Sequence, residues 1–258
     1  MNENEIRSRL TTKVLGQKVH IYETLDSTNT RAKMLALENA PEGTVVVAEE
    51  QTAGHGRFER LWCSEKGRNL TFSVILKPKL PRNRIGMLSI AAGLAVAKAI
   101  TETTGRRAET KWPNDVLLNH KKVCGVLSES IIRDENIAAA VVGIGVNVNQ
   151  LVFPQELTDS ATSLLLETGR SLDRTQVFGN VLGQLEYWYN RINSGIFDEM
   201  LEEWHGLSMM MGKTITLDQQ GKLITGVARR IAGDGGLILQ SDGKEMKILS
   251  GDVTVIRD

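Results

Sequence analysis

TKWPNDVLLNHKKVCGVLSE, residues 110–129, predicts a loop, a strand, a short turn and a return strand. The apolar run Val116–Leu118 forms the first arm, and the following Asn119-His120 pair tolerates turn geometry. Val123–Leu127 begins the return strand, where Gly125 marks a close approach by a ligand or another strand. The pattern therefore predicts a hairpin with one glycine in its second arm.

Two lysines, Lys111 and Lys122, stand at the start of the two arms. If the arms pair, both ammonium groups can face one anionic site, and a compact point charge suits phosphate or carboxylate. The alternative is two solvated lysines beside an ordinary hairpin. These residues alone leave both interpretations open.

Composition limits the class of protein. The chain has 258 residues, 41% hydrophobic and 24% charged, which fits one large domain or a large domain with a small one. A net charge of zero argues against broad nonspecific binding to nucleic acid. Two cysteines give neither a disulfide framework nor a metal pattern. The N-terminal residues lack the apolar core of a signal peptide, and Ile85–Ala97 is shorter than the roughly 20 residues that span a bilayer. We therefore expect a cytoplasmic protein without a membrane segment.

Two segments of the N-terminal half offer polar groups to a ligand. Val19–Leu25 predicts a strand, and the DSTN sequence after it precedes a helix over Thr30–Asn39. DSTN caps that helix, offers free N–H groups to a ligand, or does both. Thr44–Glu50 predicts a buried strand leading into QTAGHGRFERLW, residues Gln51–Trp62. Arginines there bind phosphate and a tryptophan stacks on a purine, whereas the alternative is a flexible surface loop.

The central elements follow from periodicity. Asn69–Leu76 alternates strictly and predicts a half-buried strand, and Arg84–Thr104 predicts a long apolar helix ended by Gly105. Asn136–Asn149 predicts a buried strand in which Gly143, Gly145 and Asn147 face one way. These small residues either leave room for a ligand or allow tight strand packing.

The C-terminal third contains a change of pattern near residue 208. Before it, helices are expected over Ala161–Glu167, Asp173–Asn193 and Phe197–Trp204. After it, five short strands alternate with turns, which is typical of a small barrel. These strands are expected at Thr214–Leu217, Leu223–Ile231, Leu237–Gln240, Met246–Leu249 and Val253–Ile256. We expect one domain over residues 1–207 and a second over 208–258.

Several motifs together resemble the biotin–protein ligase family, in the form without an N-terminal DNA-binding domain. The resemblance covers nearly the whole chain, and KWPND followed by KxxGVL is its most specific part. The matching motifs are STN (Ser27–Asn29), QTAGHGRxxRxW (Gln51–Trp62), KWPND with KxxGVL (Lys111–Leu127), GIGVN (Gly143–Asn147) and GDV (Gly251–Val253).

This resemblance implies an α+β fold: a mixed sheet with helices like that of class II aminoacyl-tRNA synthetases, followed by an SH3-like barrel. It implies that ATP, with Mg²⁺, activates biotin as biotinyl-5′-AMP, and that a lysine of a biotin carboxyl carrier protein or domain then accepts the biotin. It implies no resident metal and no DNA partner, since the residues before Val19 are too few for a helix-turn-helix. Monomer and homodimer both remain open.

The resemblance also assigns roles to residues. Lys111 would bridge the biotin carboxylate and the α-phosphate, with Arg57 and Arg60 as the other catalytic cations. The expected biotin-binding residues are Ser27, Thr28, Asn29, Gln51, His55, Gly56, Arg57 and Lys111. The expected ATP-binding residues are Arg57, Arg60, Trp62, Lys122 and Asn147, with Trp62 over the adenine.

One residue departs from the family pattern. His55 replaces the first arginine of the usual GRGR, and an imidazole is largely neutral near pH 7, so retention of the adenylate is expected to be weaker or pH-dependent. A lipoate–protein ligase is the alternative enzyme, although it needs an apolar tunnel rather than ureido donors. A non-catalytic biotin-binding regulator is the alternative outside the enzymes.

Overall fold

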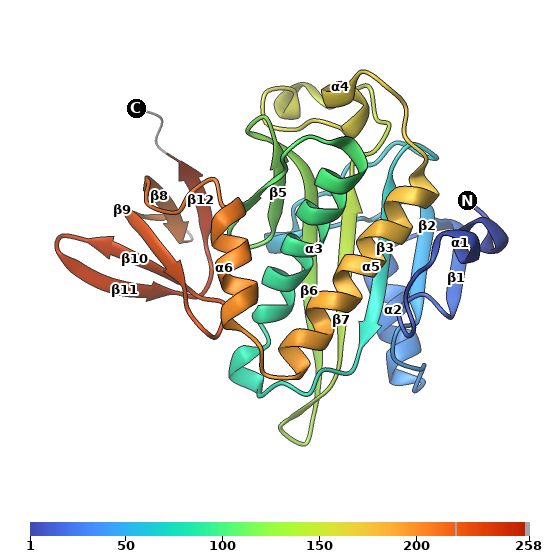
Figure 1. Ribbon diagram of the computed structural model, residues 1–258, viewed down its shortest axis with the longest axis horizontal. Helices are drawn as coiled ribbons and strands as arrows, with labels where there is room; N and C mark the ends of the chain where they lie inside the picture. Colours follow the sequence, from blue (N-terminus) through green and yellow to red (C-terminus); the bar gives the residue numbers. More distant parts are fainter. Residues whose placement is uncertain (220, 256–258) are drawn as a thin grey trace.

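A seven-stranded mixed sheet forms the centre of the protein (Figure 1). The computed structural model describes residues 1–219 and 221–255. The strand order is β1-β2-β3-β7-β6-β5-β4, and only the β1–β2 pair is parallel. The strands are β1 (Val19–Leu25), β2 (Val45–Gln51), β3 (Leu70–Leu76), β4 (Glu109–Lys111), β5 (Asp115–Leu118), β6 (Lys121–Arg133) and β7 (Asn136–Val146).

Helices cover both faces of this sheet. Figure 1 shows α3, α5 and α6 together in front of it, where α3 packs between the strands and α5. The helices are α1 (Glu3–Arg9), α2 (Thr28–Leu37), α3 (Met87–Thr104), α4 (Leu164–Thr168), α5 (Arg174–Asn193) and α6 (Asp198–Leu207). Gly105 ends α3 with a φ of 70°, as the sequence predicted. The segment Arg82–Thr104 is long and apolar enough to cross a membrane, but it is mostly buried inside the fold, as core helices are.

The prediction for β3 was wrong in one respect. Its alternating pattern indicated a half-buried strand, whereas all seven residues are buried. The second face of β3 is covered because Ala32 and Leu35 of α2 pack in one apolar cluster with Ile75 and Val141. Thr71 and Ser73 therefore lie inside the protein rather than in water.

The hairpin predicted from residues 110–129 is confirmed, with longer arms. Asn119 and His120 turn the chain with φ values of 46° and 64°. The return strand β6 continues to Arg133, well beyond Leu127. Lys111 lies on the short edge strand β4, where its backbone stands opposite that of Asp115 in the antiparallel strand β5.

A second, antiparallel sheet follows α6, in the strand order β11-β10-β9-β8-β12. Its strands are β8 (Thr214–Gln219), β9 (Lys222–Ile231), β10 (Leu237–Ser241), β11 (Lys244–Ile248) and β12 (Asp252–Val255). All five predicted strands are present, although Ile256, the predicted end of the last one, lies outside the described residues. Trp112, between β4 and β5, connects the first sheet to the C-terminal part of the chain. Its Nε1 donates to the carbonyl of Gly235, between β9 and β10, at 2.9 Å, and its backbone N–H contacts Met210 Sδ.

Candidate active site

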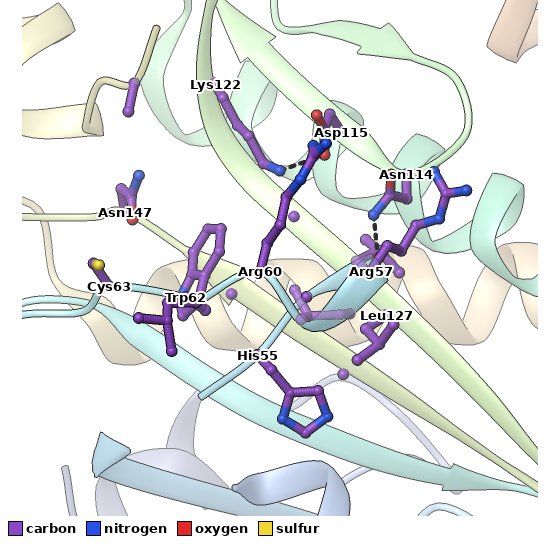
Figure 2. Close-up of a pocket in the computed structure, with 18 of the residues that line it drawn as sticks. His55, Arg57, Arg60, Trp62, Cys63, Asn114, Asp115, Lys122, Leu127 and Asn147 are labelled. Carbon is purple, nitrogen blue, oxygen red and sulfur yellow. Dashed lines mark hydrogen bonds and ion pairs between the residues drawn. The ribbon is translucent and has the colours of Figure 1, made fainter. Parts of the chain in front are cut away.

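A cavity of about 540 Å³ opens on the sheet face opposite α3 and α5 (Figure 2). Gly143 and Gly145 of β7 line it, while the alternating Val142 and Ile144 pack into the core with α3. All of the residues predicted to bind biotin or ATP line this one cavity. They are Ser27, Thr28, Asn29, Gln51, His55, Gly56, Arg57, Arg60, Trp62, Lys111, Lys122 and Asn147.

One end of the cavity, called the closed end below, is formed by Ser27, Thr28 and Asn29 of the DSTN segment together with Gln51 of β2. Ser27 caps α2 by accepting a hydrogen bond from the Thr30 N–H, so the capping interpretation is confirmed, and Ser27 also lines the cavity. The backbone N–H and the hydroxyl of Thr28 lie 2.7 and 3.0 Å from Gln51 Oε1. The side chains at this end are therefore held in place by hydrogen bonds within the protein.

The glycines of β6 and β7 make room for protein side chains. A Cβ on Gly143 would lie 2.2 Å from Asn29 Oδ1, and one on Gly145 would lie 2.4 Å from Trp62 Cε2. A Cβ on Gly125 would also approach Trp62, at 3.1 Å. The predicted space is thus real, but Asn29 and the Trp62 indole occupy it. Within the described residues the buried Nε1 of Trp62 has no hydrogen-bond partner.

Lys111 and Lys122 have different surroundings although both line the cavity. Lys122 Nζ lies 2.6 Å from Asp115 Oδ1, and the two side chains meet in Figure 2. The Lys111 ammonium makes no hydrogen bond or ion pair with any of the described residues. Burial lowers the pKa of Lys111, and the nearby Asp115 carboxylate partly offsets this effect. Lys111 is therefore the cation whose charge a bound anion would stabilise most.

The segment Gly54–Trp62, called the arginine loop below, reaches the second sheet. Arg57 Nη1 donates to the Gly251 carbonyl at 3.1 Å, and Arg60 forms an ion pair with Asp252 of β12. Burial lowers the pKa of Arg57, and the Asp252 carboxylate opposes this effect. Phe58 adopts a left-handed φ of 55°, which costs about 1–2 kcal/mol for a residue with a Cβ. The loop is therefore strained locally and held by contacts with the C-terminal strand.

The His55 side chain points away from the loop's arginines. Figure 2 shows its ring on the opposite side of the loop from the side chains of Arg57 and Arg60. Its Nδ1 lies 3.2 Å from the Ala53 carbonyl oxygen. His55 lines the cavity, but its ring is not part of the cationic cluster.

Asn147 offers a free acceptor to the cavity. Its Nδ2 donates to the Thr162 carbonyl at 3.0 Å, which fixes the orientation of the amide. Its buried Oδ1 then has no donor among the residues that the structure describes. An oxygen of this kind suits a hard cation such as Mg²⁺ or a ligand amino group.

Sequence reasoning missed several residues that shape the site. Asp115 and Asp252 line the cavity, and each stood inside a quoted motif, KWPND or GDV, without an assigned role. Ser73 lies behind the closed end and was expected to face outward on a half-buried strand. Only the Thr-Ser alternation within β3 indicated that polar groups were available there.

Comparisons with known proteins show which family the chain resembles. The model of the biotin/lipoate A/B protein ligase family matches residues 21–147. The bifunctional ligase/repressor BirA of Bacillus subtilis (strain 168) is 37% identical over 255 residues, covering 98% of this chain and 78% of that protein. The biotin–[acetyl-CoA-carboxylase] ligase of Mycobacterium tuberculosis is 30% identical and covers 100% of this chain and 96% of its own.

A solved structure is similar along most of the chain. The biotin protein ligase from Aquifex aeolicus in complex with biotin and ATP superimposes with a TM-score of 0.81 at 33% identity. The match covers 94% of this chain and 100% of that one. The similarity therefore extends into both sheets.

Proposed function

This chain belongs to the biotin protein ligases of the biotin/lipoate A/B protein ligase family, and from that premise we propose its reaction. It is an ATP-dependent ligase that activates biotin as biotinyl-5′-AMP and transfers it to a lysine of a biotin carboxyl carrier protein or domain. The observation that carries this proposal is the single cavity, which joins a hydrogen-bonding closed end to a cationic loop.

Activation brings two anions together, the biotin carboxylate and the α-phosphate of ATP. Lys111 is placed for this step because its side chain is partly buried and its ammonium has no carboxylate partner in the described residues. Arg57 and Arg60 hold phosphates, exchanging their contacts with Gly251 and Asp252 for the nucleotide. Fixed cations of this kind stabilise the charge that develops during phosphoryl transfer.

Nucleotide recognition uses the side chains around β6 and β7. The Trp62 indole packs over Gly125 and Gly145 and presents an aromatic surface to adenine. Asn147 Oδ1 fits a Mg²⁺ that arrives with ATP, and that ion would neutralise phosphate charge.

Transfer follows from the reactivity of the adenylate. The neutral amine of the carrier lysine attacks the biotinyl carbonyl, an amide bond forms, and the bond to AMP breaks as AMP leaves. Until then water must be kept out, and closure of the arginine loop over the adenylate serves this purpose.

We also propose a fold type for each of the two sheets. The mixed sheet with its helices is of the class II aminoacyl-tRNA-synthetase type, and the five-stranded C-terminal sheet is SH3-like. We place the boundary between the catalytic domain and the C-terminal domain at residues 207 and 208. The support is the change from helices to short antiparallel strands at this point.

The test is ATP–pyrophosphate exchange with biotin or lipoate as the acid. The proposal expects exchange with biotin, little with lipoate, and biotin transfer to a carrier domain but not to the carrier with its acceptor lysine changed to arginine. Exchange with lipoate alone would assign the chain to the lipoate ligases, and exchange with neither would leave only a binding role.

A further inference from the structure

Two side chains behind the closed end have no role in the reaction described above. Ser73 of β3 is fully buried, and Glu129 of β6 is half-buried. Both contact Asn29: Ser73 Oγ lies 2.6 Å from its Oδ1, and Glu129 Oε2 lies 2.7 Å from its Nδ2. They reach a ligand only through the residues that line the cavity.

The orientation of the Asn29 amide follows from its neighbours. One side of the amide faces the Glu129 carboxylate and the Leu127 carbonyl, the latter at 3.3 Å, and both can only accept hydrogen bonds. The nitrogen must therefore lie on that side, and the oxygen must face Ser73. Lys33 Nζ lies 2.5 Å from the other Glu129 oxygen and holds the carboxylate in place.

The amide oxygen then sets the direction of the next hydrogen bonds. Ser73 has one hydroxyl hydrogen and two contacts, Asn29 Oδ1 at 2.6 Å and Thr28 Oγ1 at 2.8 Å. Because Asn29 Oδ1 cannot donate, it takes the Ser73 hydrogen. Ser73 Oγ then accepts from Thr28 across the 2.8 Å contact. Gln51 Oε1, 3.0 Å from Thr28 Oγ1, is the alternative acceptor, and with either one the single hydroxyl hydrogen of Thr28 is used inside the protein.

The closed end consequently presents a fixed pattern to a ligand. Thr28 has only an oxygen lone pair left for the cavity, so it acts as an acceptor. Gln51 Oε1 is held by the Thr28 N–H, which leaves the Gln51 amide hydrogens free to donate. An acceptor beside a donor matches a ring with an N–H next to a C=O, and a ring of carbon and sulfur offers neither.

We propose that Glu129 and Ser73 are positioning residues that fix the direction of this hydrogen-bond chain, so that Thr28 can only accept from the ligand. The proposal rests on the function proposed above and deepens it. The closed end selects acids whose ring carries an N–H group, as the ureido ring of biotin does.

The test compares biotin with an analogue in which one ureido N–H is replaced by a ring oxygen, each of the two positions being used in turn. The kcat/KM of ATP–pyrophosphate exchange is measured for biotin and for both analogues in the wild type, Glu129→Ala and Ser73→Ala. Glu203→Gln is the control, because it removes a similar ion pair, with Lys98, between α3 and α6 and away from the cavity.

The wild type is expected to prefer biotin strongly over at least one analogue. Glu129→Ala and Ser73→Ala should each reduce that preference by about tenfold, which corresponds to about 1.4 kcal/mol, through a higher KM for biotin at nearly unchanged kcat. The control should keep the wild-type preference. If one variant does not fold, the other carries the test.

A preference that stays constant in the folded variants would overturn the proposal, even if their melting temperatures fall, because a purely structural role predicts that pattern. Failure of the proposed function is distinguishable, since the wild type would then show no exchange with biotin at all.

Discussion

The two ends of the cavity differ in how exposed their side chains are and in how firmly hydrogen bonds hold them. At the closed end, Ser27, Thr28 and Asn29 are each about 4% exposed, and hydrogen bonds within the protein orient their side chains. At the arginine loop, the Arg60 side chain is 68% exposed and contacts the second sheet through one ion pair. The closed end is preorganised before a ligand binds, whereas the arginine loop is more exposed and is held by a few contacts with the second sheet and the residue before it.

From this difference we infer that the closed end determines affinity for biotin and that the cationic end acts in the phosphoryl-transfer step. A preorganised polar pocket gives affinity and selectivity because little must be reordered on binding. A cation without a partner among the described residues, such as Lys111, gains most when charge appears on the substrate, which happens at the phosphoryl-transfer step. Changes at the closed end should therefore raise KM for biotin, and changes at the cationic end should lower kcat.

The largest expected effect comes from Lys111→Ala. Loss of this partly buried charge should reduce the rate of adenylate formation by about 100- to 1,000-fold, because Arg57, Arg60 and Lys122 of the same cavity already contact other protein groups. Biotin-dependent pyrophosphate exchange at saturating substrates measures the effect. Lys98→Ala, on the helical face of the sheet, is the matched control and should be near wild type. Near-normal exchange in Lys111→Ala would remove it from the chemistry.

A smaller effect is expected from Thr28→Val, which keeps the shape of the side chain but removes the acceptor. Losing this hydrogen bond should raise KM for biotin by about 10- to 100-fold, while kcat and KM for ATP change little. Steady-state exchange at varied biotin and ATP concentrations measures both constants. A fall in kcat with constant KM for biotin would contradict the division between the two ends.

The smallest effect concerns pH. Burial lowers the pKa of Lys111 below its ordinary value of 10.5, and the cationic form is the active one, so activity is lost as pH rises through this lowered pKa. Because kcat/KM reports groups of the free enzyme, its alkaline limb should begin below pH 10.5. In Lys111→Arg this limb should disappear from the residual activity, since a guanidinium does not titrate in this range. An identical limb in both enzymes would assign it to another group.

Local sequence patterns predicted several turns, helix ends and strands correctly, because these features depend on a few neighbouring residues. The Asn119-His120 turn, the glycine that ends α3 and the small residues of β7 each follow from backbone requirements of a few residues. The resemblance to a family predicted that residues of distant segments, such as Gln51 and Lys111, bind the same ligand. Both residues line one cavity in the structure.

The remaining features depend on contacts that no local pattern contains. The face of β3 that carries Ser73 is buried because α2 folds over it, although the strand's own alternation indicates exposure. Asp252 reaches Arg60 across 192 positions of sequence, through the packing of the second sheet. Glu129 had no assigned role, because its contacts with Asn29 and Lys33 join segments that lie far apart in the sequence.

The division between the two ends is tested most directly by single-turnover adenylate formation measured against biotin concentration, in Lys111→Ala and Thr28→Val. Each curve gives an apparent dissociation constant and a limiting rate. The account predicts that Lys111→Ala keeps the wild-type half-saturation and loses the limiting rate, and that Thr28→Val does the reverse. Parallel losses of both quantities in both variants would contradict it.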